Sequence, residues 1–285
     1  MFAGLAAAID EGAPQPPSPI LVPVRAGTGT PLFLVHGLSG SVMECWGLVC
    51  ALRSPRPVYG LQALGLDGEQ PTQRCVEDMA ASYIEQMRTV QPDGPYALAG
   101  YSFGGLVALE IAQQLMGAGE HIAFLCLLDT YVHEHFLPWS AWMRHCCSYL
   151  SYQWRKLRAV PASQRFGYLT DMLGKAADRV GMSLGRMTRR PDAYTESFPP
   201  ALWRVREAMR QATTTYRPQP YHAGPIVYVR AAIRHQDWGD PISLWRRVAR
   251  GGLMIAEVPS DHADMLVEPT LQVVAALLDE GLENA

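Results

Sequence analysis

The sequence has little charge of either sign and very little lysine. Charged residues make up 18% of its 285 residues and hydrophobic residues 48%, and Lys156 and Lys175 are the only lysines among 24 basic residues. So small a charged fraction beside so large an apolar one excludes wholesale disorder and is sufficient for a substantial core. The formal net charge of −3 argues against nucleic-acid binding by the chain as a whole. The length suits a single α/β domain.

The sequence also lacks a long apolar run, a zinc-like cysteine pattern and a basic N-terminal start. No stretch is apolar enough to span a bilayer, and MFAGLAAAIDEG is a poor signal peptide because Asp10 and Glu11 come early. The six cysteines form no CxxC pair, so we expect reduced thiols in a cytoplasmic protein. The runs His133–His135 and His145–Cys147 fit no common metal spacing, and we expect no metal site.

Proline and charge are unevenly distributed. Residues 11–19, EGAPQPPSP, are extended linker-like material. We expect 1–19 to be a flexible leader, tethered upstream or simply a loose terminus, and 20–285 to form one domain. Residues 131–225 hold 14 basic and 6 acidic residues, a net charge of +8, and the remainder carries −11. This surplus indicates either a solvated helical insert or a docking face for an acidic partner.

Short apolar runs alternate with helical patterns, and several runs are continuously apolar, as buried parallel strands require. This alternation predicts an α/β fold, a mostly parallel central sheet flanked by helices. Helices fit at about 41–53, 74–90, 103–117 and 266–282. The strand candidates are Ile20–Arg25, Pro31–His36, Pro57–Ala63, Tyr96–Tyr101, Ala123–Leu128, Ile226–Ala231 and Leu253–Val258.

The region 132–218 breaks the alternation. It contains no convincing strand, and three helices fit near 138–158, 162–182 and 199–216. It is rich in aromatic residues, which suit either ordinary helix packing or a cover that excludes water. Because it lies between two strands, we expect a helical lid inserted over the strand ends.

The segment Gly100-Tyr101-Ser102-Phe103-Gly104 follows an apolar strand and opens a helix. This is the context that a G-x-S-x-G nucleophile elbow needs, and the glycines avoid clashes with the neighbouring strand and helix. Gly37-Leu38-Ser39-Gly40-Ser41 is a near miss that lacks this context. We therefore predict that Ser102 is the nucleophile of an α/β-hydrolase.

A serine nucleophile needs a base, which on this fold follows the last strand. His262 in Val-Pro-Ser-Asp-His has that position, whereas His222 and His235 do not. The residues leave the acid open. Asp129 ends the strand after the elbow, where a buried carboxylate needs a partner, and Asp237 and Asp240 follow the next strand.

The oxyanion hole should combine the backbone N–H of Phe103 with one from the loop His36-Gly37-Leu38-Ser39-Gly40. Leu38 is our choice for the second donor. We expect His36 to be a loop or packing residue rather than a catalytic one.

The segments GPYALAGYSFGGLVALEIAQQL, LCLLDTY and VPSDHADMLVEP resemble the thioesterase domains that end modular nonribosomal peptide and polyketide synthases. The resemblance covers most of residues 20–282 outside the lid. It implies an α/β-hydrolase fold with a helical lid, and it selects Asp129 as the acid. The family's loop commonly has proline where Gly37 stands here.

The resemblance implies a thioesterase that releases an acyl or peptidyl chain from the phosphopantetheine arm of a carrier protein, by hydrolysis or macrocyclisation, with no cofactor of its own. Alternatives are an editing thioesterase, a free-standing carboxylesterase and, least favoured, a non-catalytic binding protein. Because such carriers are usually acidic, the basic lid could dock one. The candidate contacts are Arg155, Lys156, Arg158, Arg186, Arg189 and Arg190.

Overall fold

The computed structural model describes residues 19–132, 198–233 and 241–285 of the chain. Between 132 and 198 it also describes residues 143, 147, 150–151, 153–158, 160–170 and 172–174. The expected leader at 1–19, apart from its last residue, and much of the expected lid lie outside the described residues. The division into a leader, a domain and a lid therefore stays a prediction.

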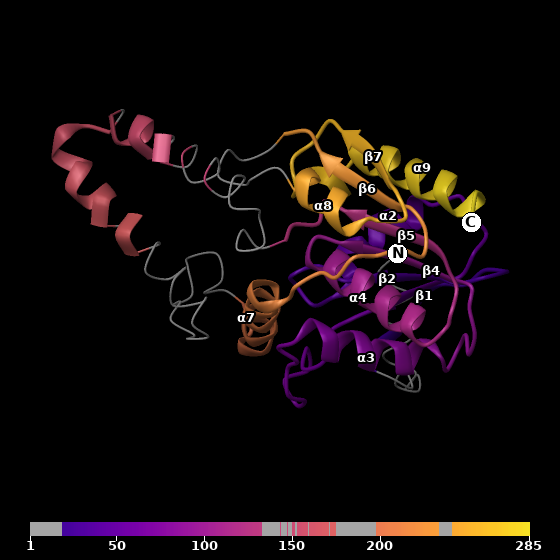
Figure 1. Ribbon diagram of the computed structural model, residues 1–285. Coiled ribbons are helices and arrows are strands. Elements are labelled where there is room, and N and C mark those ends of the chain that lie inside the picture. The colour runs from indigo at the N-terminus through magenta and orange to yellow at the C-terminus, as the bar shows by residue number, and fades with distance from the viewer. Residues whose placement is uncertain are drawn as a thin grey trace.

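A seven-stranded sheet forms the centre of the described chain (Figure 1). Strand β1 runs antiparallel to β3 at one edge, and every other neighbouring pair in the order β1-β3-β2-β4-β5-β6-β7 is parallel. Each strand lies within about two residues of its predicted run, which confirms the α/β fold class. The strands are Leu21–Arg25 (β1), Leu32–Val35 (β2), Val58–Leu61 (β3), Tyr96–Tyr101 (β4), Ile122–Leu128 (β5), Ile226–Ala231 (β6) and Leu253–Val258 (β7).

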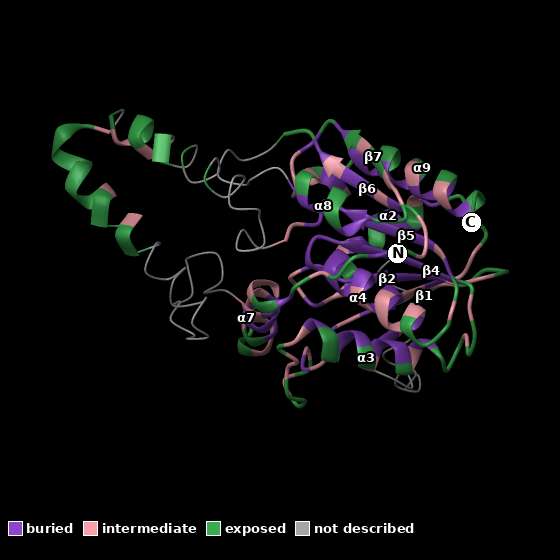
Figure 2. Ribbon diagram, in the orientation of Figure 1, coloured by how far each residue is buried: buried purple, intermediate pink, exposed green. Residues whose placement is uncertain are grey.

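Helices cover both faces of the sheet, as the burial colours of Figure 2 show. Because successive strand side chains point to opposite faces, Phe33 and Val35 pack in one apolar cluster with α3, α4, α7 and α8, and Leu32 and Leu34 pack in another with α2 and α9. Helix α8 was not predicted from the sequence. The helices are Trp46–Ala51 (α2), Val76–Met87 (α3), Phe103–Gly117 (α4), Pro200–Thr215 (α7), Ile242–Val248 (α8) and Thr270–Glu283 (α9), with 3-10 turns at Val42–Cys45 (η1), Ala162–Gln164 (η3) and Asp264–Leu266 (η4).

Helix α7 is the last of the three helices predicted within 132–218. It begins with proline at the first helical position, where the missing N–H costs no helical hydrogen bond. Its residues Val205 and Met209 are buried in the same cluster as α3 and α4, and the Tyr216 hydroxyl after it donates to Glu110 on α4 at 2.9 Å. This helix is thus part of the core, although the sequence placed it in the lid.

The described residues of the other two predicted lid helices are helical: 143, 147, 150–151 and 153–158 in the first, and, after the 3-10 turn at Ala162–Gln164, 165–170 and 172–174 in the second. No helix in the described ranges is long and apolar enough to cross a membrane.

Candidate active site

Ser102 lies in the tight turn between β4 and α4. Its φ of 56° and ψ of −118° place it in a region that residues other than glycine rarely adopt, so the turn holds a strained backbone. The Ser102 N–H donates to the carbonyl of Leu128 at 2.8 Å, which ties the turn to β5. The predicted nucleophile therefore stands at the carboxyl end of the central strand, directly before the N-terminus of α4.

The glycines around Ser102 permit this turn. A Cβ atom on Gly100 would lie 2.2 Å from the Gly104 carbonyl oxygen, and one on Gly104 would lie 2.2 Å from the His36 carbonyl oxygen. Both distances are far shorter than a van der Waals contact, and both contacts are to backbone. The expectation that side chains here would clash with the neighbouring strand and helix is confirmed.

The Gly104→Ala variant should lower the free energy of unfolding by about 1–3 kcal/mol, because the methyl group must displace the backbone at His36. Gly117→Ala is a matched control at the other end of α4, where an added Cβ meets nothing within 4 Å. That variant should instead stabilise the helix by about 0.5–1 kcal/mol. Urea denaturation of both variants measures the two effects, and equal effects would contradict the packing argument.

The structure brings Ser102, Asp129 and His262 together. His262 Nε2 lies 2.9 Å from Ser102 Oγ, and His262 Nδ1 lies 2.7 Å from Asp129 Oδ2. Because a carboxylate only accepts hydrogen bonds, the proton of neutral His262 resides on Nδ1 and Nε2 is free to accept from the serine hydroxyl. This is the arrangement in which an imidazole acts as a general base toward serine.

Asp129 is held in place by the sheet. Its N–H donates to the Val229 carbonyl at 2.7 Å, its φ is 44°, and its side chain is 1% exposed. Oδ1 accepts from the Ala231 N–H at 3.1 Å, and Oδ2 also accepts from the Tyr131 hydroxyl at 3.1 Å. Every oxygen of this buried carboxylate therefore has a donor, as burial of a charge requires.

Two tyrosines to which the sequence analysis gave no role contact His262. The Tyr101 ring stacks on the imidazole with centroids 5.1 Å apart, and its hydroxyl donates to the His262 carbonyl at 2.6 Å. The Tyr131 ring meets the imidazole edge-on at 5.7 Å. Tyr101 is the variable residue of the elbow motif and Tyr131 follows Asp129 by two positions, so proximity to motif residues was the available signal.

The two predicted oxyanion donors follow two neighbouring strands of the sheet. Phe103 is the first residue of α4, and Leu38 follows β2, the neighbour of β4 in the sheet. Among hydrogen bonds between described residues, none uses the N–H of Leu38 or Phe103 as donor.

Of the alternative residues, His222 is exposed before β6, and His235, Asp237 and Asp240 lie outside the described residues. Asp264, two residues after His262, is also exposed. Among the described residues no three His, Cys, Asp or Glu side chains are grouped to hold a metal ion, and the runs at 133–135 and 145–146 are not among them.

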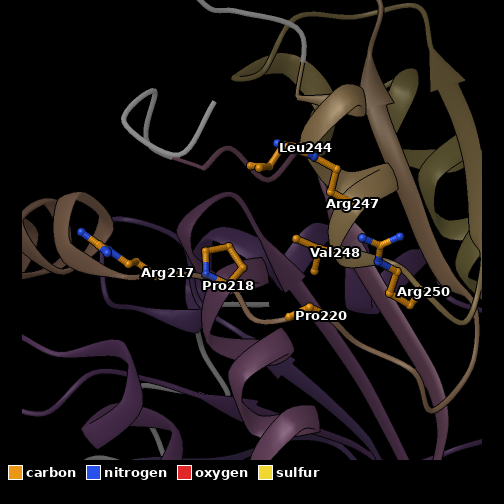
Figure 3. Close-up of a pocket in the computed structure, with 7 residues that line it drawn as sticks. All are labelled: Arg217, Pro218, Pro220, Leu244, Arg247, Val248 and Arg250. Carbon is orange, nitrogen blue, oxygen red and sulfur yellow. The ribbon is translucent and has the colours of Figure 1, made fainter. Parts of the chain in front are cut away.

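A pocket of about 350 Å³ lies elsewhere, between the segment after α7 and helix α8 (Figure 3). None of its lining residues belongs to the triad or donates to it, and the Arg217 side chain extends away from the other six. The pocket is lined by Arg217, Pro218, Pro220, Leu244, Arg247, Val248 and Arg250.

Part of the chain matches a family model, and the chain as a whole is similar to known proteins. The thioesterase domain family matches residues 30–141. A dimodular nonribosomal peptide synthase of Bacillus subtilis (strain 168) is 29% identical and covers 99% of this chain, which spans 12% of that relative. The chain thus corresponds to a small part of a much longer synthase.

Solved structures show the same fold. A four-domain nonribosomal peptide synthetase, holo-AB3403, matches with a TM-score of 0.67 and 26% identity over 97% of this chain and 21% of its own. The NocB thioesterase domain, in covalent complex with a fluorophosphonate nocardicin G analogue, matches with a TM-score of 0.59 and 24% identity over 90% of this chain and 96% of its own. The fold is that of the α/β-hydrolase thioesterases. Residues 30–141 thus match the thioesterase domain family, and the chain as a whole is similar to parts of nonribosomal peptide synthetases.

Proposed function

We propose that this chain releases an acyl or peptidyl chain from the phosphopantetheine thioester of a carrier protein through an acyl-serine intermediate on Ser102. The observation that carries the proposal is the continuous hydrogen-bonded line from Asp129 through His262 to Ser102. The relatives' membership of peptide synthetases supports a carrier-bound substrate. The chain needs no cofactor for this chemistry, because the substrate arrives on the carrier's own arm.

The reaction would run in two halves. Ser102 Oγ attacks the thioester carbon while His262 Nε2 takes the hydroxyl proton, and the N–H groups of Leu38 and Phe103 stabilise the oxyanion. The carbon–sulfur bond then breaks, and His262 returns the proton to the departing thiol. Asp129 stabilises the imidazolium that forms between these steps.

In the second half, an oxygen or nitrogen nucleophile attacks the acyl-serine and again gives its proton to His262. Water yields a linear acid, whereas an internal hydroxyl or amine yields a ring. Ser102 recovers its proton as the ester bond breaks. The same three side chains serve both outcomes, so the choice between them lies with the residues that shape the space above Ser102.

Carrier docking on the insertion belongs to the same proposal. Arg155, Lys156 and Arg158 are exposed on the helical stretch 153–158, and the Arg158 guanidinium lies 5.2 Å from the centroid of the Trp154 ring. Such a face would attract an acidic carrier at long range. The other candidate contacts, Arg186, Arg189 and Arg190, lie outside the described residues.

The test is to load the protein from a panel of acyl-pantetheine thioesters and from the matching ethyl esters. Mass spectrometry should find the acyl group on the peptide that contains Ser102, and thioesters should load faster than ethyl esters. Loading from the ethyl esters alone would contradict the proposal in favour of a carboxylesterase. A strict preference for acetyl over longer acyl groups would instead identify an editing enzyme.

A further inference from the structure

The backbone of Gly37, in the loop after β2, is held by two side chains that the proposed mechanism does not use. Its N–H donates to Glu44 Oε1, and its carbonyl accepts from His36 Nδ1 at 2.6 Å and from the Gly40 N–H at 3.2 Å. Both backbone polar groups of this buried loop residue are therefore hydrogen-bonded. The residue that follows Gly37 is Leu38, the proposed second oxyanion donor.

His36 makes this contact in one tautomer. Because a carbonyl only accepts, Nδ1 carries the proton and Nε2 accepts from the Tyr83 hydroxyl at 2.7 Å. Burial lowers the pKa of His36 to about 4, so the ring is neutral at neutral pH. The ring also stacks on Phe103, the other proposed oxyanion residue, with centroids 6.1 Å apart. The residue expected to be simple packing thus contacts both sides of the oxyanion hole.

Holding the Gly37 carbonyl also orients the Leu38 N–H. The two groups belong to one planar peptide unit, in which a trans bond points them in opposite directions. The cis peptides in the described chain are at Gly94–Pro95 and Glu268–Pro269, so the unit between Gly37 and Leu38 is trans. A hydrogen bond that fixes the carbonyl direction therefore fixes the direction of the donor.

Glu44 holds the other side of Gly37 from the turn η1. Burial raises the pKa of the Glu44 carboxyl, while hydrogen bonds from Gly37 and Ser39 and electrostatic interactions with His262 and Arg206 oppose that shift. A Cβ on Gly37 would lie 2.7 Å from Glu44 Oε1 and 3.1 Å from the Tyr101 ring. Glycine at this position thus leaves room for the carboxylate beside the site.

We propose that His36 and Glu44 are positioning residues on consecutive peptide units of this loop. His36 holds the peptide between Gly37 and Leu38, and Glu44 holds the adjoining peptide between His36 and Gly37, so that the Leu38 N–H points at the carbonyl oxygen that Ser102 attacks. This inference rests on the proposed function. Neither side chain needs to touch the substrate. Their effect is on transition-state stabilisation, since the oxyanion forms only as the serine attacks.

The test uses Glu44→Ala, Glu44→Gln and, as a matched control, Glu85→Ala on the exposed face of α3. With butanoyl-pantetheine as substrate, Glu44→Ala should lower kcat by about 10²-fold and leave KM nearly unchanged. The reason is that a wrongly oriented Leu38 N–H weakens stabilisation of the transition state and leaves substrate binding unaffected. Glu44→Gln keeps an acceptor oxygen for the Gly37 N–H and should recover most of the rate. Glu85→Ala should match the unmodified protein.

A second readout separates positioning from general weakening of the fold. Trifluoromethyl propyl ketone forms an oxyanion when Ser102 adds to it, so its inhibition constant should rise in Glu44→Ala by the same factor by which kcat/KM falls. Unchanged kcat and unchanged ketone inhibition in Glu44→Ala would overturn the inference, and so would Glu44→Gln as slow as Glu44→Ala. Thioester turnover that survives Ser102→Ala would overturn the proposed function itself.

Discussion

Replacing Ser102 with alanine should lower kcat for thioester turnover by about 10⁶-fold, because the variant has no nucleophile and falls back on attack by water. Ser102 is 8% exposed, and the substitution removes only its hydroxyl oxygen. That hydroxyl donates to His262 Nε2, 2.9 Å away. The fold should be unaffected, since the Ser102 backbone N–H still donates to Leu128.

Release of free pantetheine, followed with a thiol-reactive dye, measures this loss. Ser82→Ala is the matched control, since Ser82 lies on α3 and its hydroxyl accepts only from Gln73 among the hydrogen bonds described. The control should turn over at the rate of the unmodified protein. A residual rate in Ser102→Ala within tenfold of the control would place the nucleophile elsewhere, with tenfold taken as about 1.4 kcal/mol of barrier.

Replacing Asp129 with asparagine should lower kcat by about 10⁴-fold and leave KM nearly unchanged. Asparagine has one acceptor oxygen, and the Ala231 N–H at the Oδ1 position would hold it there. The amide nitrogen would then face His262 Nδ1 as a donor, which favours the tautomer with the proton on Nε2. In that tautomer His262 cannot accept the proton of Ser102.

Steady-state kinetics with a single pantetheine thioester give both constants. Asp264→Asn is the matched control, because Asp264 is exposed two residues from His262, and it should keep full activity. If Asp129→Asn retains its rate, the acid comes from another residue, and Asp237 and Asp240 become the candidates to test next.

The elements predicted from the sequence are those with a local pattern. All seven strands were found because short apolar runs, several of them continuous, are a local signal, and Ser102 was found because its motif and its flanking elements are contiguous. Helix α8 was missed: ISLWRRV is short, and the requirement for it comes from the parallel pairing of β6 with β7 rather than from its own residues. The antiparallel direction of β1 has no local signature either.

The contacts of Glu44 and His36 near the site could not be predicted from the sequence, because they too have no local pattern. Glu44 accepts from Gly37 only because a 3-10 turn folds back on the loop, and nothing in the seven-residue spacing indicates that contact. His36 looked like a packing histidine from its position after a strand. Its tautomer follows from the Gly37 carbonyl, and its other ring nitrogen accepts from Tyr83, which is 47 residues away in the chain. The proposed orientation of the Leu38 N–H depends on tertiary contacts of this kind.

The burial of α7 bears on how such domains could be recombined. A chimera in which residues 132–218 are replaced as one segment would lose Val205, Met209 and Ala212 from the apolar cluster that they share with α3 and α4. A cassette bounded at 132 and 198 keeps α7, and with it the Tyr216 contact to Glu110, in the recipient. In such a chimera, the C-terminal boundary of the replaced segment should therefore lie on the N-terminal side of α7.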